Sequence, residues 1–355
     1  MKRKSKNGKH SFIKRLFAVI VVIVFIAGFV FAYQVWRTAF SPNVNIEGAA
    51  ASYFYLPSGS DYDDLLGLLN EQGILDNKES FSRLADIKNL PSHIYPGRYR
   101  IEDGMSNNSL INLLRSGTQS PVNLVFNQTR SLEELASVVS RQIEADSAGL
   151  IKLFRDDSLA REMGFSTETL PAIFLPNTYE FYWNTSAVSF IERMNREYER
   201  FWSERRENLR EETGLTREEV VTLASIVAEE TNMTNEMPVI AGVYINRLNR
   251  GMRLQADPTI KFIIDDFAVN RVLSVHLKVD SPYNTYIYGG LPPGPIIIPS
   301  IDAIEAVLSF ERHDYFYFSA KEDFSGYHRF ARTLSEHNRN ARLYREALDE
   351  RRIYR

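Results

Sequence analysis

The sequence predicts an α+β protein that begins with a single N-terminal transmembrane helix. From Leu16 to Tyr33 no residue carries a charge or an amide, and Val35 and Trp36 prolong the segment to roughly the 20 residues that cross a bilayer as a helix. The rest of the 355-residue chain alternates strand-like and amphipathic helical patterns. Its 44% hydrophobic and 25% charged residues are ordinary for domains with a packed core.

Residues 1–15 carry lysine and arginine but no acidic residue, so the positive-inside rule places them in the cytoplasm and the chain after Trp36 outside it. A cleaved signal peptide is the rival interpretation. It is disfavoured because "VFA", ending at Ala32, is a poor cleavage site and the apolar core exceeds the usual range of about 7–15 residues. We therefore expect a cytoplasmic tail over residues 1–15 and a retained anchor over 16–36.

Three segments are expected after the anchor: a linker over residues 37–47, a small β/α module over 48–119 and a mixed α+β domain over 120–355. The module contains two predicted helices, of which the second starts at a serine in "SNNSLINLLRSG" and stops at Gly117. It holds few side chains suited to catalysis and is interpreted as a binding or spacer unit. In the larger domain, "AVSFIERMNREYERFWSERREN" predicts one long charged helix.

Several classes of function are excluded or disfavoured. The net charge of -3 gives no reason to expect nucleic acid as a partner. The absence of cysteine excludes thiol catalysis, disulfides and cysteine zinc sites. No P-loop, GxSxG or dinucleotide-binding pattern is present. Four histidines lie scattered without the close spacing of a zinc site, so we expect neither a metal nor another cofactor. They are His276, His313, His328 and His337.

The stretch "LASIVAEETN" ends an apolar helical pattern with two adjacent glutamates, Glu229 and Glu230. The helix is predicted to start at Thr216, where Glu219 completes a capping box. Neighbouring positions on a helix are rotated by about 100°, so the two glutamates must face different surroundings.

Helical geometry places Glu230 on the shoulder of the apolar face, and Glu229 with Thr222 and Ser225 on a face predicted to be solvated. Burial raises the pKa of a carboxyl group above its reference value of about 4.3. A carboxylic acid that stays protonated near neutral pH is what cleavage of a glycosidic bond requires. Taken alone, the pattern favours a structural ion pair between Glu230 and an arginine, and a general acid is the alternative.

Several long motifs in order resemble the endolytic murein transglycosylases, the MltG/YceG-like family. They are "FLPNTYEF", "LASIVAEET", "AGVYINRLNRGMRLQADPT", "SPYNTYIYGGLPPGPI" and "YFYFSAKEDFSGYHRFARTLSEHNRN". The resemblance extends over nearly the whole chain. It implies a bacterial enzyme of the inner (cytoplasmic) membrane, with a periplasmic catalytic domain that cuts the β-1,4 bond between N-acetylmuramic acid and N-acetylglucosamine in peptidoglycan. It also implies that residues of about 48–119 form a LysM-like module.

Many members of that family read "ASIVEKET" where this chain reads "ASIVAEET". Ala228 replaces the first glutamate and Glu230 aligns with the second, so the resemblance gives Glu230 the catalytic role. Glu230 would protonate the departing oxygen, then accept the proton of the C6 hydroxyl that attacks C1, leaving a 1,6-anhydro end without water. The candidate residues that would bind the substrate and steady its oxocarbenium-like state are Asn246, Gln255, Tyr283, Asn284 and Tyr286.

Two alternatives stay open. A catalytically inactive peptidoglycan-binding scaffold would account for Ala228 and the LysM-like module. A hydrolase would need a second carboxylate about 5–10 Å from Glu230. Asp257, expected in a turn of an extended run, and Glu236, expected at a helix start, are not convincing candidates. The resemblance implies peptidoglycan strands as substrate, and penicillin-binding proteins or other cell-wall synthases as partners.

Overall fold

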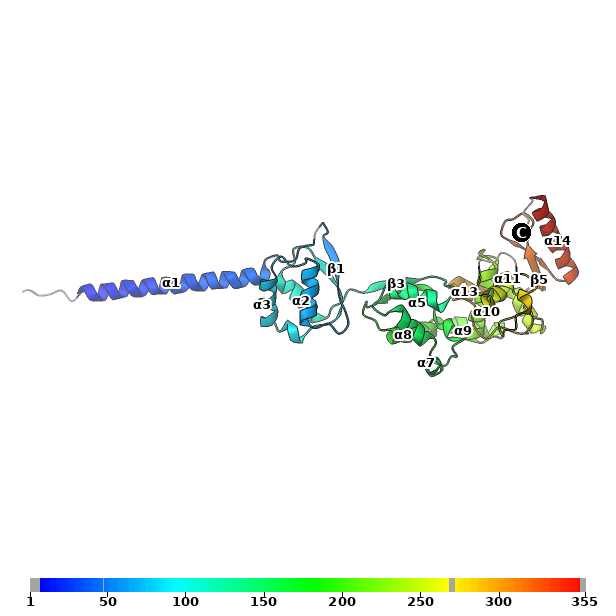
Figure 1. Cartoon of the computed structure of the whole chain (residues 1–355), viewed down its shortest axis with the longest axis horizontal. Helices are drawn as coiled ribbons and strands as arrows, with labels where there is room; N and C mark the ends of the chain where they lie inside the picture. The colour runs from blue at the N-terminus through cyan, green and yellow to red at the C-terminus, as the bar shows by residue number, and fades with distance from the viewer. Residues whose placement is uncertain (1–6, 47, 268–271, 352–355) are drawn as a thin grey trace, which may run out of the picture. The chain divides into compact units, whose positions relative to one another are not determined.

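The computed structural model describes residues 7–46, 48–267 and 272–351 (Figure 1). Helix α1 (Asn7–Phe40) contains the predicted anchor and continues past Trp36, so the start of the expected linker is helical. Within its segment Phe12–Phe40, the apolar 18-residue window has a mean hydropathy of 3.0, and no residue of that window is buried. Within the described residues it is the one helix long and apolar enough to cross a membrane, which is consistent with a membrane anchor.

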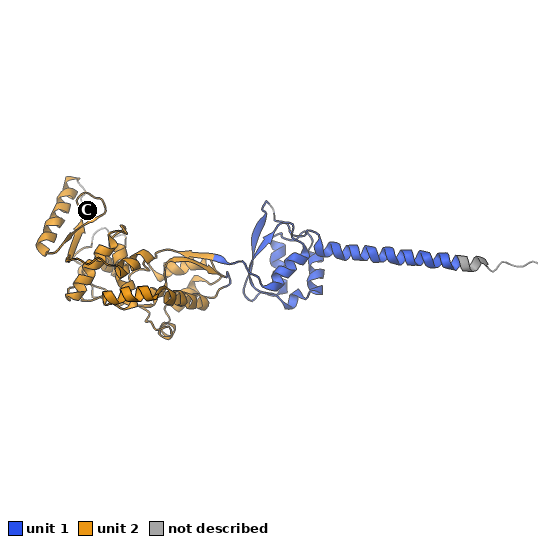
Figure 2. Cartoon of the chain, turned by 180° about the vertical axis from the view of Figure 1, so that it is seen from behind, with its two compact units in different colours: residues 1–122, 182–184 blue, residues 123–181, 185–355 orange. Residues whose placement is uncertain are grey.

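The chain forms two compact units, residues 1–122 with 182–184 and residues 123–181 with 185–355 (Figure 2). In the first unit, two antiparallel strands pair with Phe54 opposite Tyr99, and both side chains are fully buried. Three helices and one 3-10 turn complete its core. The elements after α1 are β1 (Ala51–Leu56), α2 (Tyr62–Glu71), α3 (Lys78–Ile87), η1 (Leu90–Ser92), β2 (Gly97–Glu102) and α4 (Asn107–Ser116).

Helix α4 begins after its N-cap Ser106 and ends at Gly117, which has a φ of 63°, as the sequence predicts. The expectation of two helices in this unit is wrong, because α3 is a third. Its buried stripe consists of Phe81, Leu84 and Ala85 in an otherwise polar segment, which gives a weak helical pattern. The LysM-like assignment of this unit stays a prediction.

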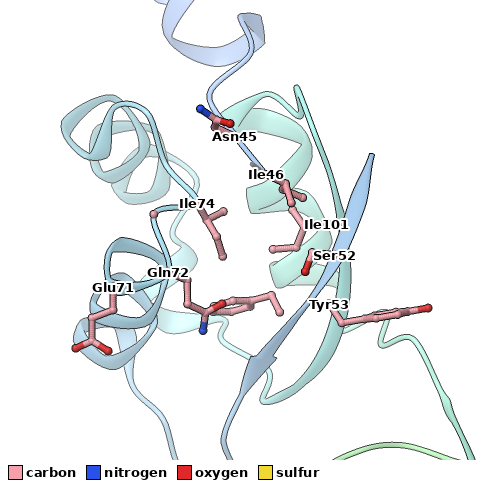
Figure 3. Close-up of a pocket in the computed structure, with 10 residues that line it drawn as sticks. Asn45, Ile46, Ser52, Tyr53, Glu71, Gln72, Ile74 and Ile101 are labelled. Carbon is pink, nitrogen blue, oxygen red and sulfur yellow. The ribbon is translucent and has the colours of Figure 1, made fainter. Parts of the chain in front are cut away.

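A pocket of about 450 Å³ lies in the first unit, beside β1 and the end of α2 (Figure 3). Its apolar lining includes Ile46, Ile74 and Ile101, and its polar lining includes Gln72 and Glu71. It lies in a different unit from the residues that the sequence marks for chemistry.

The second unit is mostly helical, and it contains a sheet of β3 and β4 and an antiparallel hairpin of β5 and β6 against which α14 packs. The predicted long charged helix is instead two helices, α8 and α9, because the chain leaves the helical conformation at Trp202 and Ser203. The elements are β3 (Val122–Phe126), α5 (Leu132–Ser140), α6 (Ser147–Phe154), α7 (Asp157–Glu162), η2 (Leu170–Ile173), β4 (Asn177–Phe181), α8 (Ala187–Phe201), α9 (Glu204–Thr213), α10 (Arg217–Glu230), α11 (Met237–Asn249), α12 (Asp257–Ile263), η3 (His276–Lys278), α13 (Ile301–Leu308), β5 (Tyr317–Ala320), β6 (His328–Ala331) and α14 (Leu334–Glu350).

Helix α10 lies at the centre of this unit, where α11, α12 and α13 pack against it. It begins with the predicted capping box of Thr216 and Glu219. The prediction of a solvated face is wrong, because Thr222 and Ser225 are almost completely buried. The Ser225 hydroxyl donates to the Thr222 carbonyl at 2.7 Å and accepts the Ile296 N–H at 3.0 Å. A hydroxyl whose hydrogen bonds are satisfied can be buried at little cost.

The segment "LQADPT" also differs from the prediction. It is not extended throughout, because α12 begins at Asp257. Pro258 occupies the first turn of this helix. A proline has no backbone N–H, and this costs no hydrogen bond there, because the first N–H groups of a helix have no partner within it. The helix places the Asp257 side chain at the pocket described next.

Candidate active site

Glu230 is the last residue of α10 and lines a pocket of about 370 Å³. The neighbouring helix α11 brings Tyr244 to it, and the Tyr244 hydroxyl donates a hydrogen bond of 2.5 Å to Glu230 Oε1. Tyr244 is itself only 1% exposed, so its ring is fixed by packing. The pocket is lined by Glu230, Tyr244, Arg247, Gln255, Asp257, Tyr286, Tyr317, Phe318, Leu334 and His337.

Burial raises the pKa of Glu230 to about 7. The hydrogen bond from Tyr244 opposes this shift because it stabilises the carboxylate, and the positive charges of Lys261 and Arg247 oppose it too. The negative charge of Asp257 adds to the shift. At neutral pH, Glu230 therefore exists both as the protonated acid and as the carboxylate, and the hydrogen bond from Tyr244 stabilises the carboxylate.

Asp257 is a second carboxylate in the same pocket. The Tyr286 hydroxyl donates to Asp257 Oδ1 at 2.5 Å, and burial together with this hydrogen bond and the nearby charge raises the pKa of Tyr286 far above its usual value. Tyr286 therefore stays a protonated donor that fixes the carboxylate of Asp257. The pocket holds one carboxyl group paired with Tyr244 and another paired with Tyr286.

Arg247 supplies a fixed positive charge in the pocket wall. It is 7% exposed, and its guanidinium donates to the carbonyl oxygens of Phe316 at 2.6 Å and Leu254 at 2.5 Å. These bonds tie α11 to the strand segment before β5 and to the segment before α12. Both accepting groups are backbone carbonyls, and among the described residues no carboxylate forms an ion pair with Arg247.

A match to the YceG-like family covers residues 54–343 of the chain. The chain belongs to the YceG-like family. It is 27% identical over 316 residues to the endolytic murein transglycosylase of Bacillus subtilis (strain 168), which covers 83% of this chain and 85% of that relative. It is 29% identical over 359 residues to the endolytic murein transglycosylase of Streptococcus pneumoniae serotype 2 (strain D39 / NCTC 7466), covering 91% of this chain.

The chain spans 64% of the length of that pneumococcal relative. Among solved structures, the crystal structure of a putative YceG-like protein from Listeria monocytogenes aligns with a TM-score of 0.54 and 26% sequence identity. The alignment covers 81% of this chain and 98% of the other. The mixed α+β fold is thus shared with that YceG-like structure over the aligned part of the chain.

Two of the five predicted substrate-binding residues in this YceG-like chain line the pocket with Glu230. They are Gln255 and Tyr286. Gln255 has a φ of 49°, a left-handed conformation that is uncommon for a residue other than glycine. Such conformations concentrate at functional sites, which adds to the case for Gln255.

The other three predicted residues lie outside that pocket. The Asn246 amide donates to the carbonyls of His313 and Tyr315, and the fully buried Asn284 amide donates to those of Leu277 and Val279. The side-chain amides of these two residues therefore hold backbone segments together through hydrogen bonds to their carbonyl groups. Tyr283 lines a different pocket, in which its ring lies 4.7 Å from that of Phe262.

Glu229 does not line the Glu230 pocket, and it is partly buried rather than solvated. Burial raises its pKa, whereas Arg130 and Lys261 lower it. The sequence analysis missed Tyr244 and Arg247 as site residues, and it set Asp257 aside as an unconvincing second carboxylate, although Asp257 lines the pocket. Tyr244 could have been recognised from the sequence, because it lies on the apolar side of α11, the helix that follows α10. A buried phenol needs a hydrogen-bond partner.

No group of histidines and acidic residues that could hold a metal ion occurs in residues 7–46, 48–267 and 272–351. The predicted absence of a cofactor stays a prediction.

Proposed function

We propose that this chain is a membrane-anchored endolytic transglycosylase of peptidoglycan. In this proposal it cleaves the β-1,4 bond between N-acetylmuramic acid and N-acetylglucosamine and leaves 1,6-anhydro ends. The observation that carries the proposal is Glu230, with its pKa raised to about 7 and its bond to Tyr244. Membership of the YceG-like family and relatives named endolytic murein transglycosylase support it.

In the first step, protonated Glu230 donates its proton to the glycosidic oxygen as the bond from C1 to that oxygen breaks. The positive charge that develops at C1 and the ring oxygen is stabilised by the Asp257 carboxylate, which lines the same pocket. The Tyr244 hydroxyl stabilises the Glu230 carboxylate formed in this step.

In the second step, the Glu230 carboxylate accepts the proton of the C6 hydroxyl as that oxygen bonds to C1. The proton that Glu230 lost is returned, so the residue ends in its starting state and no water is consumed. A single residue acts as acid and then base, for which a pKa near the working pH is favourable in both directions.

A hydrolase stays the second candidate function, because Asp257, which the sequence analysis judged unconvincing as a second carboxylate, lines the same pocket as Glu230. In a hydrolase it would activate a water or attack C1. The transglycosylase is preferred because the relatives carry that name and because the bond from Tyr286 gives Asp257 a fixed position in the wall.

The orientation of the chain in the membrane, the roles of its two domains and its partners are also part of the proposal. The basic residues before α1 favour a cytoplasmic N-terminus and an extracytoplasmic catalytic unit at the bacterial inner (cytoplasmic) membrane. Residues of about 48–119 would act as a LysM-like glycan-binding module, and residues 120–355 as the catalytic domain. Penicillin-binding proteins or other cell-wall synthases are proposed partners.

Digestion of purified peptidoglycan by the full chain in detergent tests the function. We expect 1,6-anhydro ends in the products by mass spectrometry, and none with Glu230→Gln. Reducing ends would instead identify a hydrolase. Absence of cleavage while the protein still binds peptidoglycan would identify an inactive scaffold.

A further inference from the structure

The second unit contains another pocket, of about 330 Å³, which the proposed reaction does not use. It lies between the start of α5, the segment before η2 and residues 295–298. Its floor is apolar, with Pro171, Ile296 and Ile298, and its wall carries the adjacent rings of Phe262 and Tyr283. Apolar pockets with a few polar groups at the edge are typical of ligand sites.

The walls of this pocket are fixed in place. The Ile298 N–H donates to the Thr129 carbonyl at 2.9 Å, and the Ile296 N–H donates to the Ser225 hydroxyl of α10. Gly294 packs so tightly that an added Cβ would lie 2.0 Å from the carbonyl oxygen of Glu168. The pocket is therefore preformed and attached to the helix that carries the catalytic candidate.

Helix α12 connects the two pockets. Asp257 in its first turn lines the pocket of Glu230, and Phe262 near its end lines the second pocket. Five residues of α-helix rise by about 7.5 Å. Lys261, one residue before Phe262 on this helix, lies near enough to both Glu229 and Glu230 to lower the pKa of each.

The rim of the second pocket carries both signs of charge. The Arg130 guanidinium lies 5.4 Å from the centre of the Phe267 ring and near enough to Glu229 to lower the pKa of that carboxyl. Within the described residues it forms no ion pair at contact distance, so its positive charge can pair with a ligand in this pocket. Glu168 also lines this pocket, and a hydrogen bond from Ser166, followed by bonds from its own backbone N–H and from Thr167, lowers the pKa of its carboxyl, so it is an anion at neutral pH. The other rim carboxylate, Glu133, already pairs with an arginine outside the pocket.

We propose that this pocket binds the peptide branch of peptidoglycan, attached to the muramic acid at the cleavage site. This inference rests on the proposed function. The glycan backbone is uncharged, whereas the peptide branch offers a carboxylate to Arg130, an amine to Glu168 and apolar side chains to the floor. A peptide of three to five residues spans up to about 10–17 Å when extended, which exceeds the rise along α12.

The test compares two substrates with the full chain in detergent: linear strands that carry uncrosslinked peptides, and the same strands after an amidase has removed the peptides. We expect a KM about 5–20-fold lower for the peptide-bearing strands, as one or two charge-assisted hydrogen bonds would give. Arg130→Gln and Glu168→Gln should each raise the KM on peptide-bearing strands with kcat within about twofold, and leave the KM on stripped strands unchanged. Activity on stripped strands shows that each variant is folded.

Arg141→Gln is the matched control, because this exposed arginine on the end of α5 lies outside the pocket. It should behave as the wild type on both substrates. Equal KM values of the wild type on the two substrates would overturn the inference and leave the proposed function intact. An equal rise of KM on both substrates in Arg130→Gln would overturn it in favour of a sugar subsite.

Titration of the free peptide gives a readout that does not depend on cleavage. We expect wild-type binding in the millimolar range that Arg130→Gln weakens at least fivefold, and absence of binding would count against the inference. If neither substrate is cleaved but the peptide binds in this Arg130-dependent way, the proposed function fails and the peptide site stands.

Discussion

The Tyr244 hydroxyl donates a 2.5 Å hydrogen bond to Glu230 Oε1 and so joins the middle of α11 to the last residue of α10. Both partners belong to the pocket that also contains Asp257. Tyr244 and Asp257 act on Glu230 in opposite directions, since the first stabilises its carboxylate and the second disfavours it. Burial, which is the largest influence on the pKa of Glu230, and these two opposing contacts together set the pH range over which Glu230 can serve as a proton donor.

Glu230→Gln should lower the rate of strand cleavage by at least about 100-fold, because a glutamine cannot deliver the proton. Glu229→Gln is the neighbouring control. It should stay within a few fold of the wild type, since Glu229 does not line the pocket. The measurement is the initial rate of release of new glycan ends. Full activity of Glu230→Gln would remove the assignment of the acid.

Tyr244→Phe should move the alkaline limb of the activity profile to higher pH. The wild type needs protonated Glu230 and should lose activity as the pH rises through about 7. Without the phenol, the carboxylate is less stable and the pKa of Glu230 rises, by about one unit for a hydrogen bond to a charged group. The pH dependence of kcat checks this, and a limb that moved to lower pH would contradict it.

Asp257→Asn should move the same limb to lower pH. Removing a negative charge beside Glu230 makes its carboxylate easier to form, so its pKa falls. An asparagine can still accept the Tyr286 hydrogen bond, so the pocket should keep its shape. We also expect a lower kcat, because the charge that stabilises the oxocarbenium-like state is lost. An unchanged limb would show that Asp257 does not act on Glu230.

Glu230→Gln should be stabilising at alkaline pH. The pKa of Glu230 in the folded state is about 7, above its ordinary value of 4.5, so between these two pH values the folded state holds a proton that the unfolded state has lost. Stability therefore falls as the pH rises from about 4.5 to about 7, by at most about 3 kcal/mol.

Thermal melting at pH 4.5 and pH 8 measures this effect. The advantage of Glu230→Gln over the wild type should be larger at pH 8. Glu162→Gln, a change at an exposed glutamate at the end of α7, should follow the wild type at both pH values. Equal differences at the two pH values would speak against a destabilised carboxylate at Glu230.

Ser225→Ala should destabilise the second unit by about 1–3 kcal/mol, because the buried Ile296 N–H loses its acceptor. Ser203→Ala is a suitable comparison, since Ser203 precedes α9 without a side-chain capping bond and is exposed. It should change stability by less than about 0.5 kcal/mol. Denaturant unfolding followed by tryptophan fluorescence gives both values, and equal effects would contradict the role of Ser225.

Part of the candidate site follows from local pattern. The capping box at Thr216 fixes where α10 begins, and the 3.6-residue period then places Glu230 beside the apolar face. The motifs that resemble the YceG-like family added Gln255 and Tyr286, which the structure brings to the same pocket. The helical wheel failed for Ser225, because it treats a hydroxyl as polar and cannot know that Ile296 will bond to it.

By itself, the sequence determined the apolar anchor, the start of α10, the difference between Glu229 and Glu230 and the family. Each depends on residues close together in the chain or on the order of motifs. Only the tertiary structure decided that Tyr244 and Asp257 meet Glu230 and that Asn246 and Asn284 organise loops. The physical reason is that burial, hydrogen bonding and charge, which set the pKa of Glu230, come from side chains on separate helices. Their proximity is a property of packing around α10.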